Sequence, residues 1–205
     1  MPRHPDPDLE DRILNAAQVL WQRGGDHSLT MRAVARVART NTPAVYRRFK
    51  NRRDLLRGLL LRTVARTRQQ FEAGKTVEEI TETYVDEALR RPHEYELFYA
   101  YGRELSAARG TGRIRPIRDS RPNFGYAQDQ LAKRLGGSPD EHTRLALAMW
   151  ALVHGTATLL ISKSIPEGHE VELRRACRAA VQAMLQAAPV FSETGARKHP
   201  GNNQL

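Results

Sequence analysis

The sequence predicts an all-α protein of about nine helices. Apolar residues recur at three- and four-residue spacings from one end of the chain to the other, which is the pattern of amphipathic helices. Alternation with a period of two is scarce and runs of β-branched residues are short, so we expect no β-sheet.

The first two helices are predicted from the signals at their ends. The first begins near residue 9, where acidic residues suit the positive end of a helix dipole, and it ends at Gly24 and Gly25. The second is short, is capped by Thr30, and turns Met31 and Val34 inward.

The third and fourth helices follow closely along the chain. Asn41 is a good N-cap for the third helix, and Pro43 falls in its first turn, where the missing N–H costs nothing. Val45 and Phe49, one turn apart, form its buried side. The fourth helix covers residues 53–73 and is followed by a terminating glycine.

Five more helices are predicted in the remainder of the chain, over residues 77–91, 92–109, 122–135, 139–163 and 170–187. Capping boxes at Thr76–Glu79 and Ser138–Glu141 mark the start of two of them. Residues 110–120 are rich in glycine, proline and arginine, so we expect a loop there. The polar tail 191–205 is expected to be flexible.

Composition narrows the function. The chain has 205 residues, with 33 Lys and Arg against 23 Asp and Glu, and its formal charge of +10 suggests an anionic partner such as nucleic acid or a membrane surface. A single cysteine, Cys177, excludes an intrachain disulfide and a multi-thiolate metal site. The common nucleotide-binding and hydrolase motifs do not occur. We therefore expect neither an enzyme nor a bound metal or cofactor.

Two segments bear on localisation. The N-terminal residues include no apolar stretch of the kind that a secretory signal needs, so a cytoplasmic protein is expected. Residues 145–162 carry no formal charge over 18 positions, which reaches the lower limit for a membrane-spanning helix. Because this stretch contains His154, Gly155 and two threonines, we interpret it as a buried helix and expect no membrane partner.

The most informative segment is 27–53, which holds eight Arg or Lys residues and no acid. In the second helix, Arg32, Arg36 and Arg39 are spaced i, i+4 and i+7, so they form one cationic stripe opposite the apolar side. Like charges placed this way repel one another, and DNA phosphates would neutralise them with release of counterions. A merely solubilising face is the alternative interpretation.

The outward face of the third helix suits the major groove of double-stranded DNA. A helix in the groove needs short side chains at its N-terminal end, groups that reach base edges, and flanking cations or hydroxyls for the phosphates. Two short helices joined by about three residues describe a helix-turn-helix over about residues 30–49. Thr42, Ala44 and Arg47 suit the groove, and Tyr46, Lys50 and Arg52 suit the phosphates, with an inward-packed tyrosine as the alternative for Tyr46.

Residues 13–56 resemble the DNA-binding domain of the tetracycline-repressor (TetR) family. The features that agree are the pair Ala16–Ala17, the glycine that closes the first helix, Thr30 opening the second, and Tyr46 and Phe49 followed by Leu55–Leu56. The resemblance implies a helix-turn-helix domain over residues 1–56, a helical ligand-binding and dimerisation domain over residues 57–190, and a flexible tail over residues 191–205.

The resemblance also implies roles for single residues. Thr30 and Tyr46 would contact phosphates, and Arg32 would reach a base edge or a phosphate from the second helix. Thr42, Pro43 and Arg47 would face the groove, next to the N-cap Asn41. Arg52 stands where the family usually has a phosphate-contacting lysine.

Three positions depart from the family pattern: Arg39 stands where the turn usually has glycine, Asn41 replaces a serine or threonine cap, and Arg48 replaces a common histidine. A non-glycine residue with positive φ in the turn would cost about 1 kcal/mol. The geometry of the turn is therefore the point on which the structure is most informative.

The remainder of the chain is expected to bind a second copy and a small molecule. Family members pack two late helices against their twins, and the candidates here are 139–163 and 170–187. An uncharged helix such as residues 145–162 needs partners on several sides, which favours contact with a second copy over burial in the monomer.

An effector pocket is expected among the middle helices, where aromatic residues cluster. The candidate lining residues are Tyr99, Arg103, Tyr126, Trp150 and His154. Plain core packing is the alternative for these side chains. Cys177 is either an oxidant-sensing thiol, because arginines flank it, or a small buried hydrophobe.

The sequence therefore predicts a homodimeric transcriptional regulator, a repressor, that binds palindromic operator DNA and is released by a small-molecule effector. Two alternatives stay open at this point. One is a basic helical protein associated with RNA or a membrane, and the other is a helical protein that binds small molecules without any DNA activity.

Overall fold

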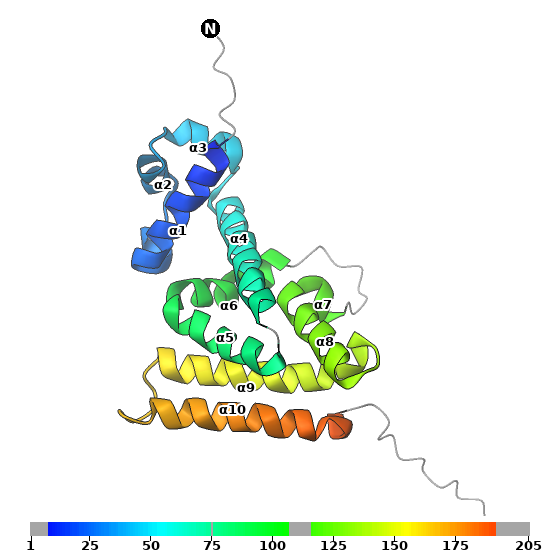
Figure 1. Ribbon diagram of the computed structural model, residues 1–205. Helices are drawn as coiled ribbons and strands as arrows, with labels where there is room; N and C mark the ends of the chain where they lie inside the picture. The colour runs from blue at the N-terminus through cyan, green and yellow to red at the C-terminus, as the bar shows by residue number, and fades with distance from the viewer. Residues whose placement is uncertain (1–7, 75, 107–115, 192–205) are drawn as a thin grey trace, which may run out of the picture. The chain divides into compact units, whose positions relative to one another are not determined.

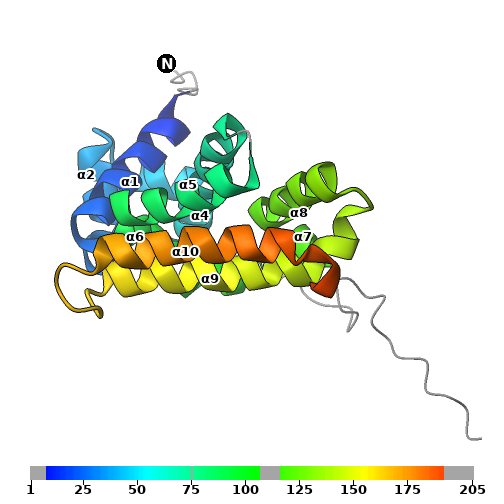
Figure 2. The same ribbon diagram turned by 60° about the horizontal axis from the view of Figure 1, so that its bottom comes forward.

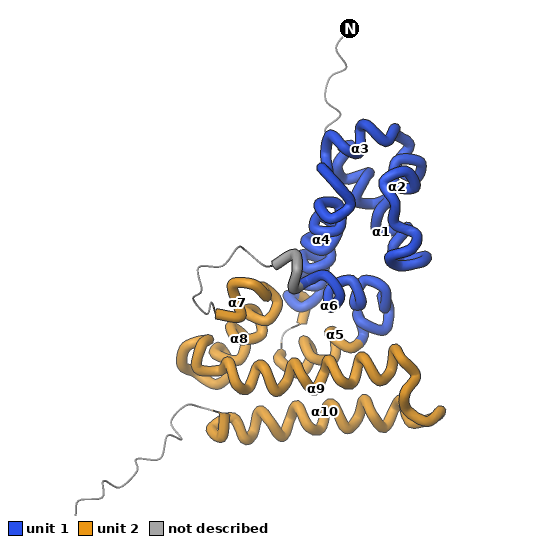
Figure 3. Tube along the Cα trace, turned by 180° about the vertical axis from the view of Figure 1, so that it is seen from behind, with its two compact units in different colours: residues 1–72, 86–115 blue, residues 73–85, 116–205 orange. Residues whose placement is uncertain are grey.

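The chain is helical throughout the part that the structure describes. The computed structural model describes residues 8–74, 76–106 and 116–191, with the side chains of residues 103–106 excepted. These residues form ten α-helices and two short 3-10 helices, and no strand occurs among them (Figure 1). The predicted all-α fold is confirmed. The chain divides into two compact units, residues 1–72 with 86–115, and residues 73–85 with 116–205 (Figure 3).

The first unit contains helices α1 (Leu9–Ser28), α2 (Met31–Val37), α3 (Thr42–Arg48), α4 (Arg52–Ala73, of which residues to 72 belong here) and α6 (Pro92–Ser106). Its core is formed by the apolar faces of all five helices. The core side chains with no measurable exposure are Ile13, Ala17, Leu29, Val34, Val45, Leu55, Leu59 and Leu97. Helix α6, which lies far along the chain, is thus part of the same core as the helix-turn-helix.

Local sequence signals explain how this unit is laid out. Helix α1 loses helical geometry at Gly24 and Gly25, where the predicted end of the first helix lies, and Gly25 has a φ of 55° that suits glycine. Helix α4 approaches α3 closely at Gly58, because a Cβ atom there would lie 2.9 Å from the ring of Phe49. Gly25 therefore allows the kink in α1, and Gly58 allows the close approach of α4 to the end of α3.

The second unit contains α7 (Ile117–Ser120), α8 (Pro122–Leu135), a 3-10 helix (Pro139–His142), α9 (Thr143–Ile161), α10 (Glu170–Gln186) and a final 3-10 helix (Ala188–Phe191). Helix α5 (Val77–Arg90) contributes its residues 77–85. Helices α9 and α10 run side by side (Figure 2). The core side chains are Val77, Phe124, Leu131, Leu145, Ala146, Met149, Val181 and Leu185.

The structure refines several predicted boundaries. The capping box at Ser138–Glu141 is present, but it begins a 3-10 turn that precedes α9 instead of the α-helix itself. Residues 117–120, expected within a loop, form the single turn α7. The predicted helix end near 109, most of the expected loop 110–120, and the tail from residue 192 lie outside the described residues.

One helical segment passes a length and hydropathy test for membrane spans. It is Pro139–Ile161, with a mean hydropathy of 1.5 and with 33% of the tested window buried in the protein. A core helix of a soluble protein passes the same test, so this segment is not evidence for a membrane.

Candidate DNA-binding surface

Helices α2 and α3 form a helix-turn-helix on the core of the first unit. Helix α2 packs against both α1 and α3, with Val34, Ala35 and Ala38 buried. Helix α3 buries Val45, and Phe49 follows it into the core. The other sides of both helices therefore face solvent, as a helix that enters a DNA groove requires.

Side-chain caps define where both helices begin. The hydroxyl oxygen of Thr30 accepts a hydrogen bond from the backbone N–H of Ala33 at 3.1 Å, and Asn41 Oδ1 accepts one from Ala44 N–H at 2.8 Å. These contacts use only the acceptor oxygens. The hydroxyl proton of Thr30 and the amide protons of Asn41 are still available as donors to an anion.

The predicted contact residues of α3 are not all on its exposed side. Tyr46 is 50% exposed, Pro43 and Arg47 are also exposed, and Thr42 is half-buried. Ala44 is 3% exposed and lies in the buried arc next to Val45, so its side chain does not belong to the outward face. The outward face of α3 is therefore narrower than the sequence suggested.

Four arginines form an exposed group that we call the cationic face: Arg32, Arg36, Arg39 and Arg47. Within the described part of the chain, their guanidinium groups have neither a carboxylate partner nor a hydrogen bond. Lys50 is likewise exposed. A set of solvated cations without internal partners can be neutralised by phosphates at little cost to the fold.

Arg52 differs from the cationic face because its side chain is bonded within the protein. Its Nε donates to the carbonyl oxygen of Leu29 at 2.9 Å, and its Nη2 donates to the carbonyl and the carboxylate of Asp26 at 3.1 and 2.6 Å. Tyr101 of α6 donates its hydroxyl proton to the same carboxylate. Arg52 thus holds the start of α4 to the segment that leads into Thr30.

The carboxylate of Asp26 is stabilised in its charged form. The hydrogen bond from Tyr101 is the main cause, followed by that from Arg52, and together they hold the pKa of Asp26 below its ordinary value. The sequence analysis gave no role to Asp26 or Tyr101. The preceding Gly24–Gly25 pair was a local sign of a turn, but nothing local pointed to a partner 75 residues away.

The turn between α2 and α3 is a Schellman motif with arginine in the position that usually holds glycine. Arg39 N–H donates to the carbonyl of Arg36 at 3.3 Å, and Thr40 N–H donates to that of Ala35 at 2.9 Å. Arg39 has a φ of 52°, which costs a residue with a Cβ atom about 1 kcal/mol relative to glycine. The positive φ considered in the sequence analysis is therefore present.

A buried carboxylate joins α6 to α1 and α4, in an arrangement that we call the Glu94 network. Glu94 is 1% exposed. It accepts hydrogen bonds from Gln18 at 3.1 Å and Gln22 at 2.6 Å on α1, and from Arg66 on α4, while Arg91 lies 3.5 Å away. Burial by itself raises the pKa of Glu94, but the hydrogen bond and charge of Arg66 and the hydrogen bonds from Gln22 and Gln18 together outweigh it, so the net pKa is lowered.

The five predicted effector-binding residues are distributed over both units. Tyr99 belongs to the first unit, where its ring lies 4.8 Å from that of Tyr95. In the second unit, Trp150 packs against Phe124 with ring centroids 5.9 Å apart. The other predicted residues there are Tyr126 and His154, both half-buried, and burial lowers the pKa of His154. The side chain of Arg103 lies outside the described residues.

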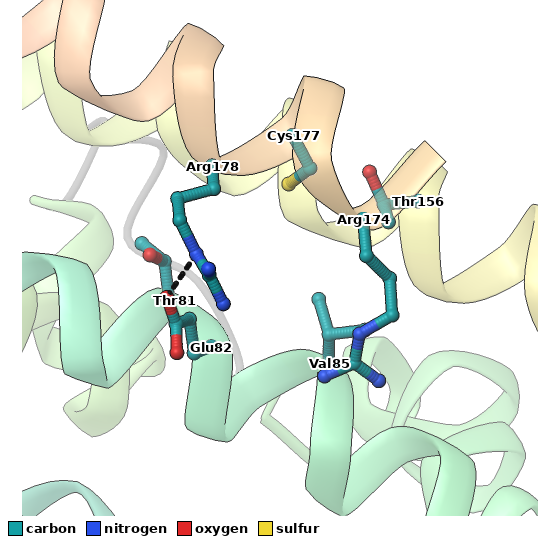
Figure 4. A pocket seen from close by; sticks show the side chains of 7 residues that line it. All are labelled: Thr81, Glu82, Val85, Thr156, Arg174, Cys177 and Arg178. Carbon is teal, nitrogen blue, oxygen red and sulfur yellow. Dashed lines mark ion pairs between the residues drawn. The ribbon is translucent and has the colours of Figure 1, made fainter. Parts of the chain in front are cut away.

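A small pocket lies among α5, α9 and α10, and none of the predicted effector-binding residues lines it. Figure 4 shows its seven lining side chains, Thr81, Glu82, Val85, Thr156, Arg174, Cys177 and Arg178. Arg178 and Glu82 form an ion pair at 2.6 Å across it. The thiol of Cys177 is buried at the pocket wall, which fits a small hydrophobe.

Helix α9 has two apolar sides. One packs into the core of the second unit through Leu145, Ala146 and Met149. The other leaves apolar or small residues exposed at helical spacing: Leu147, Ala151, Thr158 and Leu159. Helix α10 likewise exposes alanines at positions 176, 179, 183 and 187. An apolar strip shared by two neighbouring helices is typical of an interface with another protein chain.

The chain matches two family models. Residues 13–59 match the model described as bacterial regulatory proteins, tetR family. Residues 77–187, which are more than half of the chain, match the model described as tetracyclin repressor-like, C-terminal domain. The comparison with curated proteins found no match.

Solved structures of the same fold cover nearly the whole chain. A Rhodococcus sp. RHA1 protein of unknown function is 20% identical with a TM-score of 0.66, over 91% of this chain and 98% of that one. A TetR variant from Acinetobacter baumannii AYE in complex with minocycline is 18% identical with a TM-score of 0.57, over 88% and 96%. The multidrug binding protein EbrR complexed with ethidium is 19% identical with a TM-score of 0.60, over 87% and 99%.

Proposed function

Because this chain belongs to the TetR family of bacterial regulatory proteins, we propose that it is a transcriptional repressor that binds palindromic operator DNA as a homodimer and is released by a small molecule. The observation that carries the proposal is the cationic face, whose exposed guanidinium groups have no acidic partner within the described residues. Such a surface is suited to phosphate binding.

The contacts divide into those that position the protein and those that read sequence. Arg47, Thr42 and Pro43 on the exposed side of α3 face the major groove, where Arg47 is long enough to reach a base edge. Thr30, Arg32, Asn41, Tyr46 and Lys50 bind phosphates on either side. Arg52 acts mainly by positioning Thr30, because its Nε and Nη2 are already bonded to backbone and to Asp26.

The dimer forms through the exposed strips of α9 and α10. A palindromic operator requires the two α3 helices of the dimer to reach half-sites about 34–36 Å apart, one turn of the double helix. A charge placed in the strip, as in Ala151→Glu, is expected to yield a monomer by sedimentation. Lys133→Glu, an exposed change on α8, is the control and should leave the dimer intact. A dimeric Ala151→Glu variant would place the interface elsewhere.

The effector is a small organic molecule bound in the helical domain, where Tyr126, Trp150 and His154 of the second unit are the candidate contacts. Support comes from the family and from the neighbours that were crystallised with minocycline and ethidium. Release follows if the effector prefers a conformation in which the two α3 helices no longer match the groove spacing. The protein is cytoplasmic and has no catalytic role in this proposal.

The deciding experiment selects bound fragments from random duplex DNA. The purified protein is expected to enrich a palindrome, and its affinity should fall steeply with salt because several phosphates are contacted per protomer. RNA of the same length and anionic vesicles serve as competitors. Preferential binding to either competitor, or a DNA affinity that salt does not change, would contradict the proposal.

A further inference from the structure

The backbone of the turn between α2 and α3 does not favour the residue that occupies it. Arg39 is the left-handed residue of the Schellman motif, with a φ of 52°. Glycine adopts this conformation without strain, whereas any side chain brings a Cβ atom too close to the backbone. An arginine in this place therefore lowers the stability of the turn.

The charges around position 39 do not favour an arginine there either. Arg39 is exposed, and the described residues offer its guanidinium no acid or hydrogen bond. A cation near the end of a helix gains from the helix dipole, but Arg36 already fills that role in the last turn of α2. Arg39 lies beyond the end of α2, so it is not part of the helical stripe of Arg32 and Arg36, and it adds one more cation to the same acid-free segment.

The second unit contains a matched case for comparison. Lys163 follows α9 with the same φ of 52° and the same pair of bonds, from Lys163 N–H to Leu160 and from Ser164 N–H to Leu159. Its surroundings differ, because Glu167 and Glu170 follow within a few residues. The backbone conformation is thus shared, and the acid-free surroundings are particular to Arg39.

The position of Arg39 suggests what the side chain does. In a bound helix-turn-helix the first helix crosses the DNA backbone and the N-terminal end of the second enters the major groove. Arg39 lies between the two, two residues before the N-cap Asn41. We propose that Arg39 binds a phosphate at the edge of the groove, and that the strained arginine is kept for this contact. The inference rests on the proposed DNA binding.

The test replaces Arg39 by residues that separate strain from charge. Arg39→Gly is expected to raise the melting temperature by about 2 °C. It should weaken DNA binding about tenfold per protomer and lower the slope of log affinity against log salt by about 0.9 per protomer. Asparagine also tolerates positive φ but carries no charge, so Arg39→Asn should lower the salt slope as much as Arg39→Gly does. Lysine keeps the charge, so Arg39→Lys should have the salt slope of the wild type.

The probes are a duplex selected by the wild-type protein and an unrelated duplex of the same length. Because phosphates carry no sequence information, Arg39→Gly should weaken both equally. Lys163→Gly is the matched control, and it should raise the melting temperature without changing the affinity for either duplex.

Four outcomes would count against the inference. If Arg39→Gly melts at a lower temperature than the wild-type protein, the strain argument is wrong. In a second outcome, Arg39→Gly matches the wild type in DNA affinity and salt slope while Arg47→Ala weakens binding to the selected duplex. In that case the protein binds DNA, but Arg39 makes no phosphate contact. If Lys163→Gly lowers the affinity as much, the effect is not specific to the turn. If the wild-type protein binds neither duplex, the proposed function and this inference both fall.

Discussion

The cationic face and the Glu94 network lie in the same unit and use arginine for opposite purposes. On the cationic face, guanidinium groups are solvated and have no carboxylate partner among the described residues. In the network, Arg66 turns inward to a carboxylate that is almost fully buried. A buried charge must be compensated inside the fold, whereas a solvated charge can be compensated by a ligand. Residues of the first set can therefore be replaced with little loss of stability, whereas replacing residues of the second set lowers the free energy of unfolding.

The largest expected effect is on stability, from Glu94→Ala. Removing the carboxylate leaves the half-buried Arg66 without its counter-charge and deprives Gln18 and Gln22 of an acceptor, so we expect a loss of about 3 kcal/mol in the free energy of unfolding. Urea denaturation measures this loss. Glu96→Ala, on the exposed side of the same helix, is the control and should change stability by less than about 0.5 kcal/mol. Equal effects of the two variants would mean that the network does not hold the unit together.

Lowering the pH should reduce the contribution of the Glu94 network to the stability of the wild-type protein. Because the folded-state pKa of Glu94 is lowered, its contribution is complete above the ordinary value of 4.5 and is lost as the pH falls below that value and through the folded-state pKa. Unfolding free energies measured between neutral pH and pH 3 should therefore fall more steeply for the wild type than for Glu94→Gln. Parallel curves would assign the acid sensitivity to other carboxylates.

Arg47→Ala should do the opposite of Glu94→Ala, because it should weaken DNA binding and leave the stability of the fold unchanged. We expect the affinity for a selected duplex to fall by about 1–3 kcal/mol and base preference to relax. Tyr46→Phe should weaken binding to all duplexes alike, because it removes only the hydroxyl that we propose binds phosphate. Urea denaturation should be unchanged for both. If the two variants exchanged these effects, the outward side of α3 would have to be reassigned.

The smallest expected effect comes from Asp26→Asn, because the pair with Arg52 is largely exposed. Exposed pairs contribute little, so we expect a loss of less than about 1 kcal/mol in unfolding free energy. A double-mutant cycle with Tyr101→Phe would measure how strongly the hydroxyl and the carboxylate interact. A loss as large as that of Glu94→Ala would show that this exposed cluster is as important as the buried one.

The sequence predicted the features that are encoded locally. The caps at Thr30 and Asn41 and the capping boxes depend on residues within one turn of each other, and all are confirmed. The end predicted for the first helix at Gly24–Gly25 is a kink, beyond which α1 continues to Ser28. The turn α7 was missed because Ile117–Ser120 is too short to show any helical periodicity.

Contacts between residues far apart in the sequence could not be predicted from local sequence patterns. Gln18 and Glu94 are 76 positions apart, and nothing near Glu94 distinguishes it from an exposed helical acid. Arg52 was assigned to phosphate by resemblance, and its bonds to Leu29 and Asp26 could be seen only once the chain was folded. Ala44 was assigned to the DNA groove because its side chain is small, but its size does not show which side of α3 it lies on, and it is buried.

The place of α6 in the first unit has a consequence for protein engineering. A sensor built by grafting residues 1–56 onto a foreign effector domain would leave behind Leu97, which fills the core, and Glu94, which Gln18 and Gln22 need as an acceptor. Such a chimera would expose an apolar cavity lining and two orphaned amides. The transplantable module is the helix-turn-helix together with α4 and α6, so the junctions of a working hybrid belong between residues 72 and 73, 85 and 86, and 115 and 116.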